Sequence, residues 1–487
     1  MKQKVNSIIL SVMLLFGFSW LTGCGSNSVK YEQITSIEDL YAMESNKSYE
    51  LTCDIDLQGG EWFPLEVKNF NGNGYTIRNC YISTPVQNYD DKGYKLSVSG
   101  GFFAKLNRLE DIAFDNIQVN VTFADGTQEC NGGVVAGEMK EIENVTITNS
   151  KGFFTLSSSD EEEHDYVNCG VIAGVIKGTG YPSGKTIKNV QVENCELRCS
   201  RIYRALRVGG IAGSVVFHET EIADNKVTDS RIFADADYLY CGGVFGDLEY
   251  YSGIASGCVS KNNRFDLKAH PIHTKAVASS VGGVVGCSSK NSNIEKSVSS
   301  NNEIILIRSS RNETLFTDNG GYRMGGVVGS SAGKISNCLS DSNTISGSSE
   351  STSSKQFASV GGLCGYASAT ISKSVAQNNT ISETNTVSAS AMLSAGFVAK
   401  TSASVTNCAV HNNTVNGKKQ DVFTAKVEDR LFDCYVAGQD ESIANANSLP
   451  VLSSEQWNAI ITVLSLDSDW NMENGILYLE LNKIKAD

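Results

Sequence analysis

Histidine and acidic side chains that could bind a metal or transfer a proton occur in this sequence only at incomplete spacing. His218-Glu219 begins the pattern of a helical zinc site, but Ile222 stands where the second histidine is required. His270 and His273 form one pair in an expected loop, and no third ligand accompanies them. The sequence therefore predicts no metal site, no catalytic residue and no cofactor.

The acidic residues give the chain a net charge of −14. This balance argues against nucleic acid as a partner, because a phosphate backbone is bound by positively charged surfaces. Enzymes that cleave polysaccharides need paired carboxylates on one face. Asp54 and Asp56 instead lie in an expected turn, and the acidic run 160–163 lies in an expected loop.

The first residues have the composition of an export signal. Lys2 and Lys4 supply a positive start, an apolar stretch follows, and Leu21-Thr-Gly-Cys24 ends the segment. These last four residues resemble the bacterial lipobox, where cleavage occurs before a lipidated cysteine. The resemblance implies a signal peptide over 1–23. It also implies a mature chain that is anchored to a membrane of the cell envelope through lipid on Cys24, and we expect display at the cell surface.

The elements that must position any site come from an internal repeat. A glycine pair, or a close variant of it, is followed by apolar residues and another small residue in nine copies, spaced 32 to 43 residues apart. The copies begin at Gly100, Gly132, Cys169, Gly209, Gly242, Gly282, Gly325, Gly361 and Ala395. One copy is too small to bury an apolar face alone, so successive copies are expected to stack.

A second column of residues follows each glycine element. A small or polar residue is followed five positions later by asparagine, or once by aspartate. The members are Asn116, Asn149, Asn194, Asp229, Asn263, Asn302, Asn343, Asn379 and Asn413. Asparagine tolerates left-handed turns, and its amide can bond its counterparts in neighbouring coils as a ladder.

Short strands that stack in this way predict an all-β chain folded as a right-handed parallel β-helix of about nine coils. We expect a tether and N-terminal cap over 24–97, repeats over 98–418 and a C-terminal cap over 419–487. A β-propeller and a series of β-sandwiches are the alternatives. A propeller blade needs four strands, whereas each copy carries only two or three strong strand signals.

The glycine elements and the strands after them resemble the GLUG repeat, which is named from the non-catalytic region of IgA-cleaving metalloproteases. The segments Phe70-Asn-Gly-Asn-Gly-Tyr-Thr-Ile77 and Trp470-Asn-Met-Glu-Asn-Gly475 resemble the start and end of such bacterial surface proteins. The resemblance implies a β-helical surface protein and says little about molecular function.

Fourteen cysteines are present, one of them Cys24. Cys258, Cys338 and Cys408 share one repeat position with Ser297 and Ser374. This placement predicts small buried residues that are mostly reduced. Disulfides between neighbouring coils stay open at this point, because only geometry can decide them.

Segments of variable length before the glycine pairs are the expected binding loops. They span 154–168, 231–240, 264–280, 305–323 and 346–359. Aromatic side chains there could stack on sugars, and the candidates are Tyr238, Tyr240, Phe316 and Tyr322. Four arginines at every third residue are expected to form a solvated edge that an acidic glycan could use: Arg198, Arg201, Arg204 and Arg207.

The resulting hypothesis is a non-enzymatic, adhesin-like or structural binding module. Its expected partners are the membrane, through the lipid, and a glycan or a protein of a host or neighbouring cell, through the loops. The alternative is a carbohydrate-active enzyme, either a polysaccharide hydrolase or a lyase, on the same scaffold.

Overall fold

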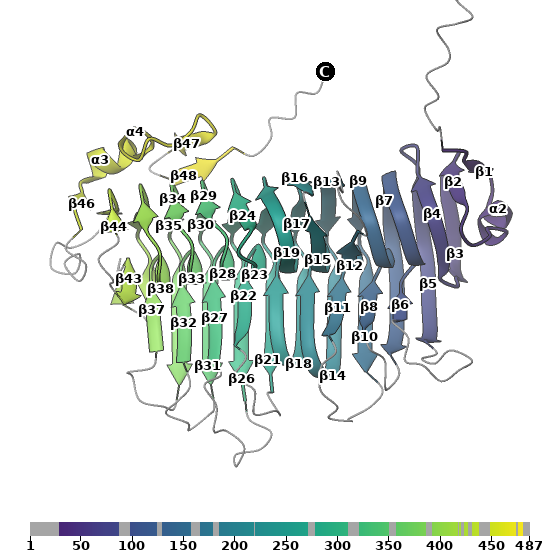
Figure 1. Ribbon diagram of the computed structural model, residues 1–487, viewed down its shortest axis with the longest axis horizontal. Helices are drawn as coiled ribbons and strands as arrows, with labels where there is room; N and C mark the ends of the chain where they lie inside the picture. Colours follow the sequence, from purple (N-terminus) through teal and green to yellow (C-terminus); the bar gives the residue numbers. More distant parts are fainter. Residues whose placement is uncertain are drawn as a thin grey trace, which may run out of the picture.

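The computed structural model describes residues 29–86, 98–123, 129–156, 166–178, 185–218, 220–270, 278–309, 321–349, 357–385, 392–416, 418–419, 423–426, 431–437, 449–473 and 476–480. The signal segment, Cys24 and Phe316 lie outside these residues. Within them, one sheet of 46 strands, almost all of them parallel, winds along the molecule (Figure 1). None of the helices in this part of the chain is long and apolar enough to cross a membrane.

One coil in the middle of the rod shows the repeating unit. Its five strands are β22 (Ser279–Gly282), β23 (Val285–Ser288), β24 (Ser292–Glu295), β25 (Val298–Ser300) and β26 (Glu303–Arg308). Each pairs in parallel with its counterpart in the next coil. Those counterparts are β27 (Gly321–Gly325), β28 (Val328–Ser331), β29 (Ile335–Ser336), β30 (Leu339–Asp341) and β31 (Thr344–Ser349).

The strands that end in the glycine pair, here called the glycine strands, form the longest regular column. Besides β22 and β27 they are β6 (Val98–Gly100), β8 (Cys130–Gly133), β11 (Tyr166–Gly170), the ends of β14 (Glu196–Gly209) and β18 (Arg231–Gly242), β32 (Phe357–Gly361) and β37 (Met392–Ala395). Successive glycine strands are joined by parallel pairings along about eight turns. The predicted parallel β-helix is therefore confirmed.

The other strands continue the remaining columns. The post-glycine strands are the start of β7 (Phe103–Phe123) and of β9 (Ala136–Thr148), then β12 (Ala173–Lys177), β15 (Ala212–His218), β19 (Phe245–Ser256), β33 (Cys364–Ala367), β38 (Val398–Thr401) and β43 (Thr424–Lys426). The next two columns contain β13 (Thr186–Glu193), β16 (Glu221–Ala223), β17 (Lys226–Thr228), β20 (Val259–Lys261), β34 (Ile371–Ser372), β35 (Val375–Gln377), β39 (Val405–Thr406), β40 (Ala409–His411), β44 (Leu431–Phe432), β45 (Tyr435–Ala437) and β46 (Val451–Leu452). We call the fifth column the outer sheet. Besides β26 and β31 it contains β10 (Lys151–Leu156), the starts of β14 and β18, β21 (Arg264–Ala269), β36 (Thr380–Asn385) and β41 (Thr414–Val415). At its end β42 (Lys418–Lys419) pairs with β41 in antiparallel fashion. The first coils are built from β1 (Glu32–Ile34), β2 (Ser48–Leu51), β3 (Ile55–Glu61), β4 (Leu65–Asn71) and β5 (Thr76–Val86).

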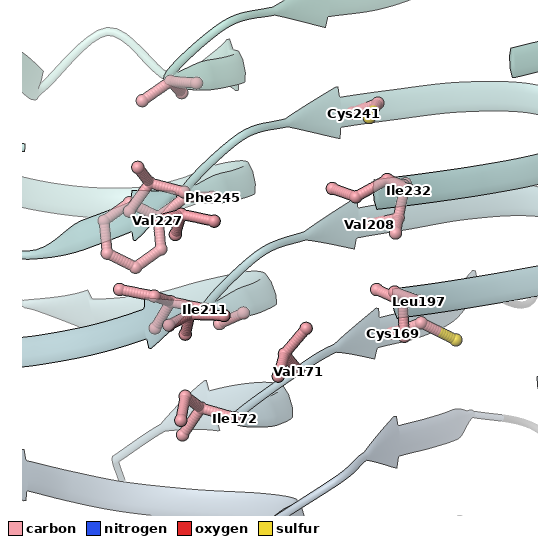
Figure 2. Close-up of a cluster of buried hydrophobic side chains, with 14 of the residues drawn as sticks. Cys169, Val171, Ile172, Leu197, Val208, Ile211, Val227, Ile232, Cys241 and Phe245 are labelled. Carbon is pink, nitrogen blue, oxygen red and sulfur yellow. The ribbon is translucent and has the colours of Figure 1, made fainter. Parts of the chain in front are cut away.

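The last glycine of most elements allows a sharp corner between two strands. A Cβ added at Gly286 would lie 2.5 Å from the carbonyl oxygen of Gly246 and 2.6 Å from the amide nitrogen of Cys241. The post-glycine strand therefore folds back until backbone meets backbone, which only glycine permits here. We call the outward-facing angle between glycine strand and post-glycine strand the glycine corner. Val284 and Val285 point inward and are fully buried, as Figure 2 shows for the equivalent residues of earlier coils.

The predicted asparagine column proves to be two columns. Its first members, up to Asp229, lie at positive φ, and the Nδ2 of Asn194 donates to the Oδ1 of Asn149 at 2.6 Å. From Asn263 onward the predicted residue is buried, and the residue before it makes the left-handed turn. The buried members form the ladder: the backbone N–H of Asn302 donates to Asn343 Oδ1 at 3.0 Å. The repeat shifts by one residue between these two groups, so asparagines at the same position of the sequence pattern have two structural roles.

No disulfide joins the cysteines of the described residues, and all of these cysteines but Cys53 and Cys287 are buried. Cys338 lies in the column that the sequence predicts, and its backbone N–H donates to Ser374 Oγ at 3.1 Å. Burial raises the pKa of the Cys338 thiol to about 12, so it stays protonated and acts as a small packing residue.

At the N-terminal end, α2 (Ile37–Tyr41) covers the first coil. It begins after Ser36, whose hydroxyl accepts from the backbone N–H of Asp39 at 3.2 Å. Leu40 is the residue that this helix buries.

At the C-terminal end, the chain turns back along the side of the rod. We call this segment, residues 454–479, the strap; it contains α3 (Ser454–Asn458), α4 (Ile460–Val463), β47 (Trp470–Glu473) and β48 (Ile476–Leu479). Figure 1 shows it in yellow above the green coils. Its apolar residues pack against outward-facing Leu339, Val375, Ala409 and Ala437. The expected C-terminal cap thus covers a side of the last coils.

Candidate functional site

The predicted aromatic contacts do not gather on a loop. Tyr238 and Tyr240 lie within β18 and Tyr322 within β27, while Phe316 falls outside the described residues. Tyr322 is 1% exposed and Tyr238 is 8% exposed, so neither ring presents a face to a ligand. Tyr240 is partly buried, and burial raises its pKa. The expectation of a binding loop over 231–240 is therefore wrong at these positions.

Strand alternation explains the difference. In β27 the side chains of Tyr322 and Met324 point into the core, and Arg323 between them faces outward. A strand that continues up to the glycine pair alternates in this way. The sequence Tyr-Arg-Met before Gly325 carries this period-two signal, which would have placed Tyr322 inside.

The structure places a hollow on the solvent face of the outer sheet, over β14, β18, β21 and β26. Its volume is about 240 Å³, and its lining includes Arg198, Phe233, Asp266, Ile305 and Ile307. The guanidinium of Arg198 lies 4.6 Å from the centroid of the Phe233 ring. Partly exposed apolar side chains that are grouped with charged ones are typical of a binding surface. We call this hollow the outer-sheet hollow.

Polar contacts hold two carboxylates that line the outer-sheet hollow, Asp266 and Asp235. Arg264 donates from Nε and Nη2 to the two oxygens of Asp266, at 2.8 and 2.9 Å, and pairs with Glu303 at 2.7 Å. His270 Nε2 lies 3.3 Å from Asp235 Oδ1. Both oxygens of Asp266 therefore accept from one guanidinium, which holds the carboxylate in a fixed orientation.

A second polar group lies in the glycine corner around Arg207, whose side chain is 7% exposed. Arg207 pairs with Asp247 at 3.0 Å and with Glu249 at 2.7 Å, and its guanidinium lies 3.6 Å from the centroid of the Tyr166 ring. Burial raises the pKa of Asp247 to about 6, although Arg207 opposes this shift. The expected solvated arginine edge is thus divided: Arg198 is exposed at the hollow, and Arg207 is buried and paired.

The strap forms a groove with the side of the rod. Its volume is about 890 Å³, and its lining includes Glu221, Asp224, Glu295 and Asp469. Lys296 bridges this groove by an ion pair with Asp469 at 2.6 Å. Sequence reasoning missed it because no local pattern shows that the strap returns to coils so far back in the chain.

No group of three or more His, Cys, Asp or Glu side chains in the described residues could hold a metal ion. These surfaces have features that suit contact with a partner. The outer-sheet hollow has an apolar floor with a charged rim, and the glycine corner has arginines stacked on tyrosine rings.

The fold defines this chain as a parallel β-helix protein. No family model matches the chain, and no curated protein matches it. Two solved structures resemble it over most of its length. A Bacteroides ovatus protein provisionally described as an immunoglobulin A1 protease is 14% identical, with 94% of each chain covered and a TM-score of 0.26. PfbA, a surface adhesin of Streptococcus pneumoniae, is 15% identical, with 78% of this chain and 80% of that chain covered and a TM-score of 0.35.

Proposed function

We propose that this chain is a membrane-anchored surface lipoprotein of the GLUG-repeat type that acts as a non-enzymatic, adhesin-like binding module. The lipobox resemblance at Cys24 supports the anchor, and the glycine elements support the repeat type. A rod of stacked coils holds its outward side chains at fixed spacing of about 4.8 Å along the axis, which suits binding more than it suits conformational change. The partner is a glycan or a protein of a host or neighbouring cell.

The outer-sheet hollow is the observation that carries this proposal. Phe233, Ile305 and Ile307 face outward on strands whose other outward positions are mostly polar. Burying such apolar side chains stabilises a complex by roughly 25 cal/mol for each Å² removed from water. The flanking Arg198 and Lys268 can orient a bound partner through hydrogen bonds.

The test is an array of mammalian and microbial glycans and extracellular-matrix proteins, probed with the full-length chain in detergent. We expect Phe233→Ala to weaken whichever interaction is found by about tenfold or more, because the ring supplies much of the apolar floor. Tyr81→Ala is the matched control, since Tyr81 is 42% exposed and does not line the hollow. Equal binding by both variants and the native chain would overturn the role of this hollow, and a blank array would overturn the proposal.

A polysaccharide hydrolase or lyase is the second candidate, because Asp235 and Asp266 both line the outer-sheet hollow. Two carboxylates are what glycoside cleavage requires. Release of reducing or unsaturated ends from polysaccharides by the native chain, lost in Asp235→Asn, would support this candidate. We expect no release, because both carboxylate oxygens of Asp266 are occupied by the Arg264 guanidinium.

A further inference from the structure

Two arginines occupy the same column of the glycine corner and have different partners. The parallel register runs Arg207, Tyr240, Ser280, Arg323 and Ser359 through successive coils. Arg207 is neutralised by Asp247 and Glu249. Arg323, three coils further on, has no carboxylate within ion-pair distance in the part of the chain that the structure describes.

Arg323 is held by aromatic rings and one hydroxyl. Its guanidinium lies 4.3 Å from the centroid of Tyr366 and 5.5 Å from that of Phe357. Its Nη1 donates to Ser330 Oγ at 3.0 Å. Stacking fixes the plane of a guanidinium and leaves its in-plane N–H groups available. One of these donors is used by Ser330, and the others are positioned for an incoming acceptor.

A second cation joins the same ring. Lys400 Nζ lies 5.7 Å from the centroid of Tyr366, and the side chain of Lys400 is exposed. Ser330, Tyr366 and Lys400 follow one another in register on β28, β33 and β38. The described residues place no carboxylate in an ion pair with Lys400 either. Two cations around one tyrosine give this corner a local positive charge, although the chain as a whole carries −14.

We propose that Arg323, Lys400 and Ser330 form a binding site for the oxyanion of an acidic polysaccharide, either a carboxylate or a sulfate group. The planar guanidinium of Arg323 matches such a group through paired N–H donors. The ammonium of Lys400, which lies in a later coil, adds a second positive charge. Phe357 and Tyr366, both partly exposed, supply apolar edges for the sugar ring beside the anion. The inference rests on the proposed binding role and names a ligand class for a site separate from the outer-sheet hollow.

Binding of the full-length chain in detergent is measured by interferometry on immobilised polygalacturonate, heparin, dextran and duplex DNA. We expect binding to the carboxylated or the sulfated polymer, weakened by salt, and none to neutral dextran. Arg323→Gln and Lys400→Gln are each expected to weaken it by about tenfold. Arg78→Gln is the matched control, because Arg78 is an exposed cation in the first coils, lies outside both proposed sites and is expected to change nothing.

Each outcome decides the inference. Equal weakening by Arg78→Gln, or equally tight binding to DNA, would mean non-specific adhesion of polyanions and overturn it. So would unchanged affinity in Lys400→Gln, whose exposed side chain can be replaced without disturbing the core. If arrays find a partner that Phe233→Ala loses while no acidic polymer binds, the inference fails and the proposed function stands. If acidic polymers bind through Arg323 and no array partner depends on Phe233, the role of the outer-sheet hollow fails instead.

Discussion

At the scale of single residues, burial in the glycine corner sets the protonation of Asp247. Its folded-state pKa is raised to about 6 by burial, against the effect of Arg207, whereas an unfolded aspartate titrates near 3.9. A raised pKa means that the folded state favours the protonated carboxyl. The stability that this preference contributes is complete below about pH 4 and is lost as the pH rises through about 6.

We therefore expect Asp247→Asn to remove a part of the pH dependence between these two values. The melting temperature of the native chain, followed by circular dichroism, should fall between pH 4.5 and pH 7 relative to that of Asp247→Asn. Glu249 still pairs with Arg207 in this variant, so the guanidinium keeps a counter-charge. Parallel melting curves across this window would contradict the assignment.

At the scale of elements, the buried asparagine ladder joins successive coils at a turn where the backbone cannot pair with itself. Asn343 accepts from the backbone N–H of Asn302 at 3.0 Å, and its Nδ2 donates to the carbonyl oxygen of Ser299 at 2.9 Å. Asn343→Ala would leave the backbone N–H of Asn302 buried without its acceptor and would remove the bonds that the Asn343 amide donates to Ser299 and Ser340. An unpaired buried group costs about 1–3 kcal/mol and each lost hydrogen bond about 1 kcal/mol, so the free energy of unfolding should fall by roughly 2–5 kcal/mol.

Urea denaturation followed by fluorescence measures this loss. The control is Thr344→Ala, because Thr344 is the neighbouring residue and its side chain is exposed. A loss of the same size in the control would show that the strand, and not the ladder, sets the effect.

These elements also show what the sequence can predict. The period of the glycine elements predicts the stacking, because identical residues must lie in register in neighbouring coils. The pattern does not show which of two adjacent residues turns inward. Asn194 and Asn343 occupy the same position of the sequence repeat, but Asn194 is exposed and Asn343 is buried. The prediction for Tyr322 fails for a different reason, because Tyr322 lies in β27 rather than in a loop and strand alternation turns its side chain inward.

The candidate site was less predictable because it is formed by residues far apart in the chain. Phe233, Asp266 and Ile305 meet at the outer-sheet hollow only because three coils stack. Arg323 and Lys400 likewise become neighbours across coils and through a shared ring. One sequence alone does not show which residues of each strand face inward, nor which side chains meet in one glycine corner.

At the scale of the whole molecule, the strap covers a stripe that would otherwise be apolar surface. One outward column changes along the rod from Gln191 and Lys226 to Val298, Leu339 and Val375, in continuous register. The polar part lies on earlier coils, and the apolar part lies where the strap packs. Exposed stripes of this kind on stacked strands promote self-association.

Ion pairs and apolar packing both hold the strap, beside a buried hydrogen bond from Gln377 Nε2 to the carbonyl oxygen of Leu477 at 2.7 Å, and their magnitudes differ. The ion pair between Lys373 and Asp467 spans 3.2 Å, with 34% and 39% of the side chains exposed, and such pairs contribute about 0–1 kcal/mol. Trp457 is 3% exposed and stacks on His411 with ring centroids 4.3 Å apart. Removing a buried ring of this size costs about 3–5 kcal/mol. Apolar packing, and not charge, should therefore keep the strap in place.

We expect Trp457→Ala to release the strap while the coils stay folded. Backbone amides of α3, and the amides of β30 and β35 beneath the strap, should exchange hydrogen faster in this variant, and size-exclusion chromatography should show self-association through the uncovered stripe. Lys373→Glu is the control and should leave both measurements close to those of the native chain. Rapid exchange in Lys373→Glu with little change in Trp457→Ala would reverse the argument, because electrostatic attraction would then hold the strap and its attachment would depend on salt.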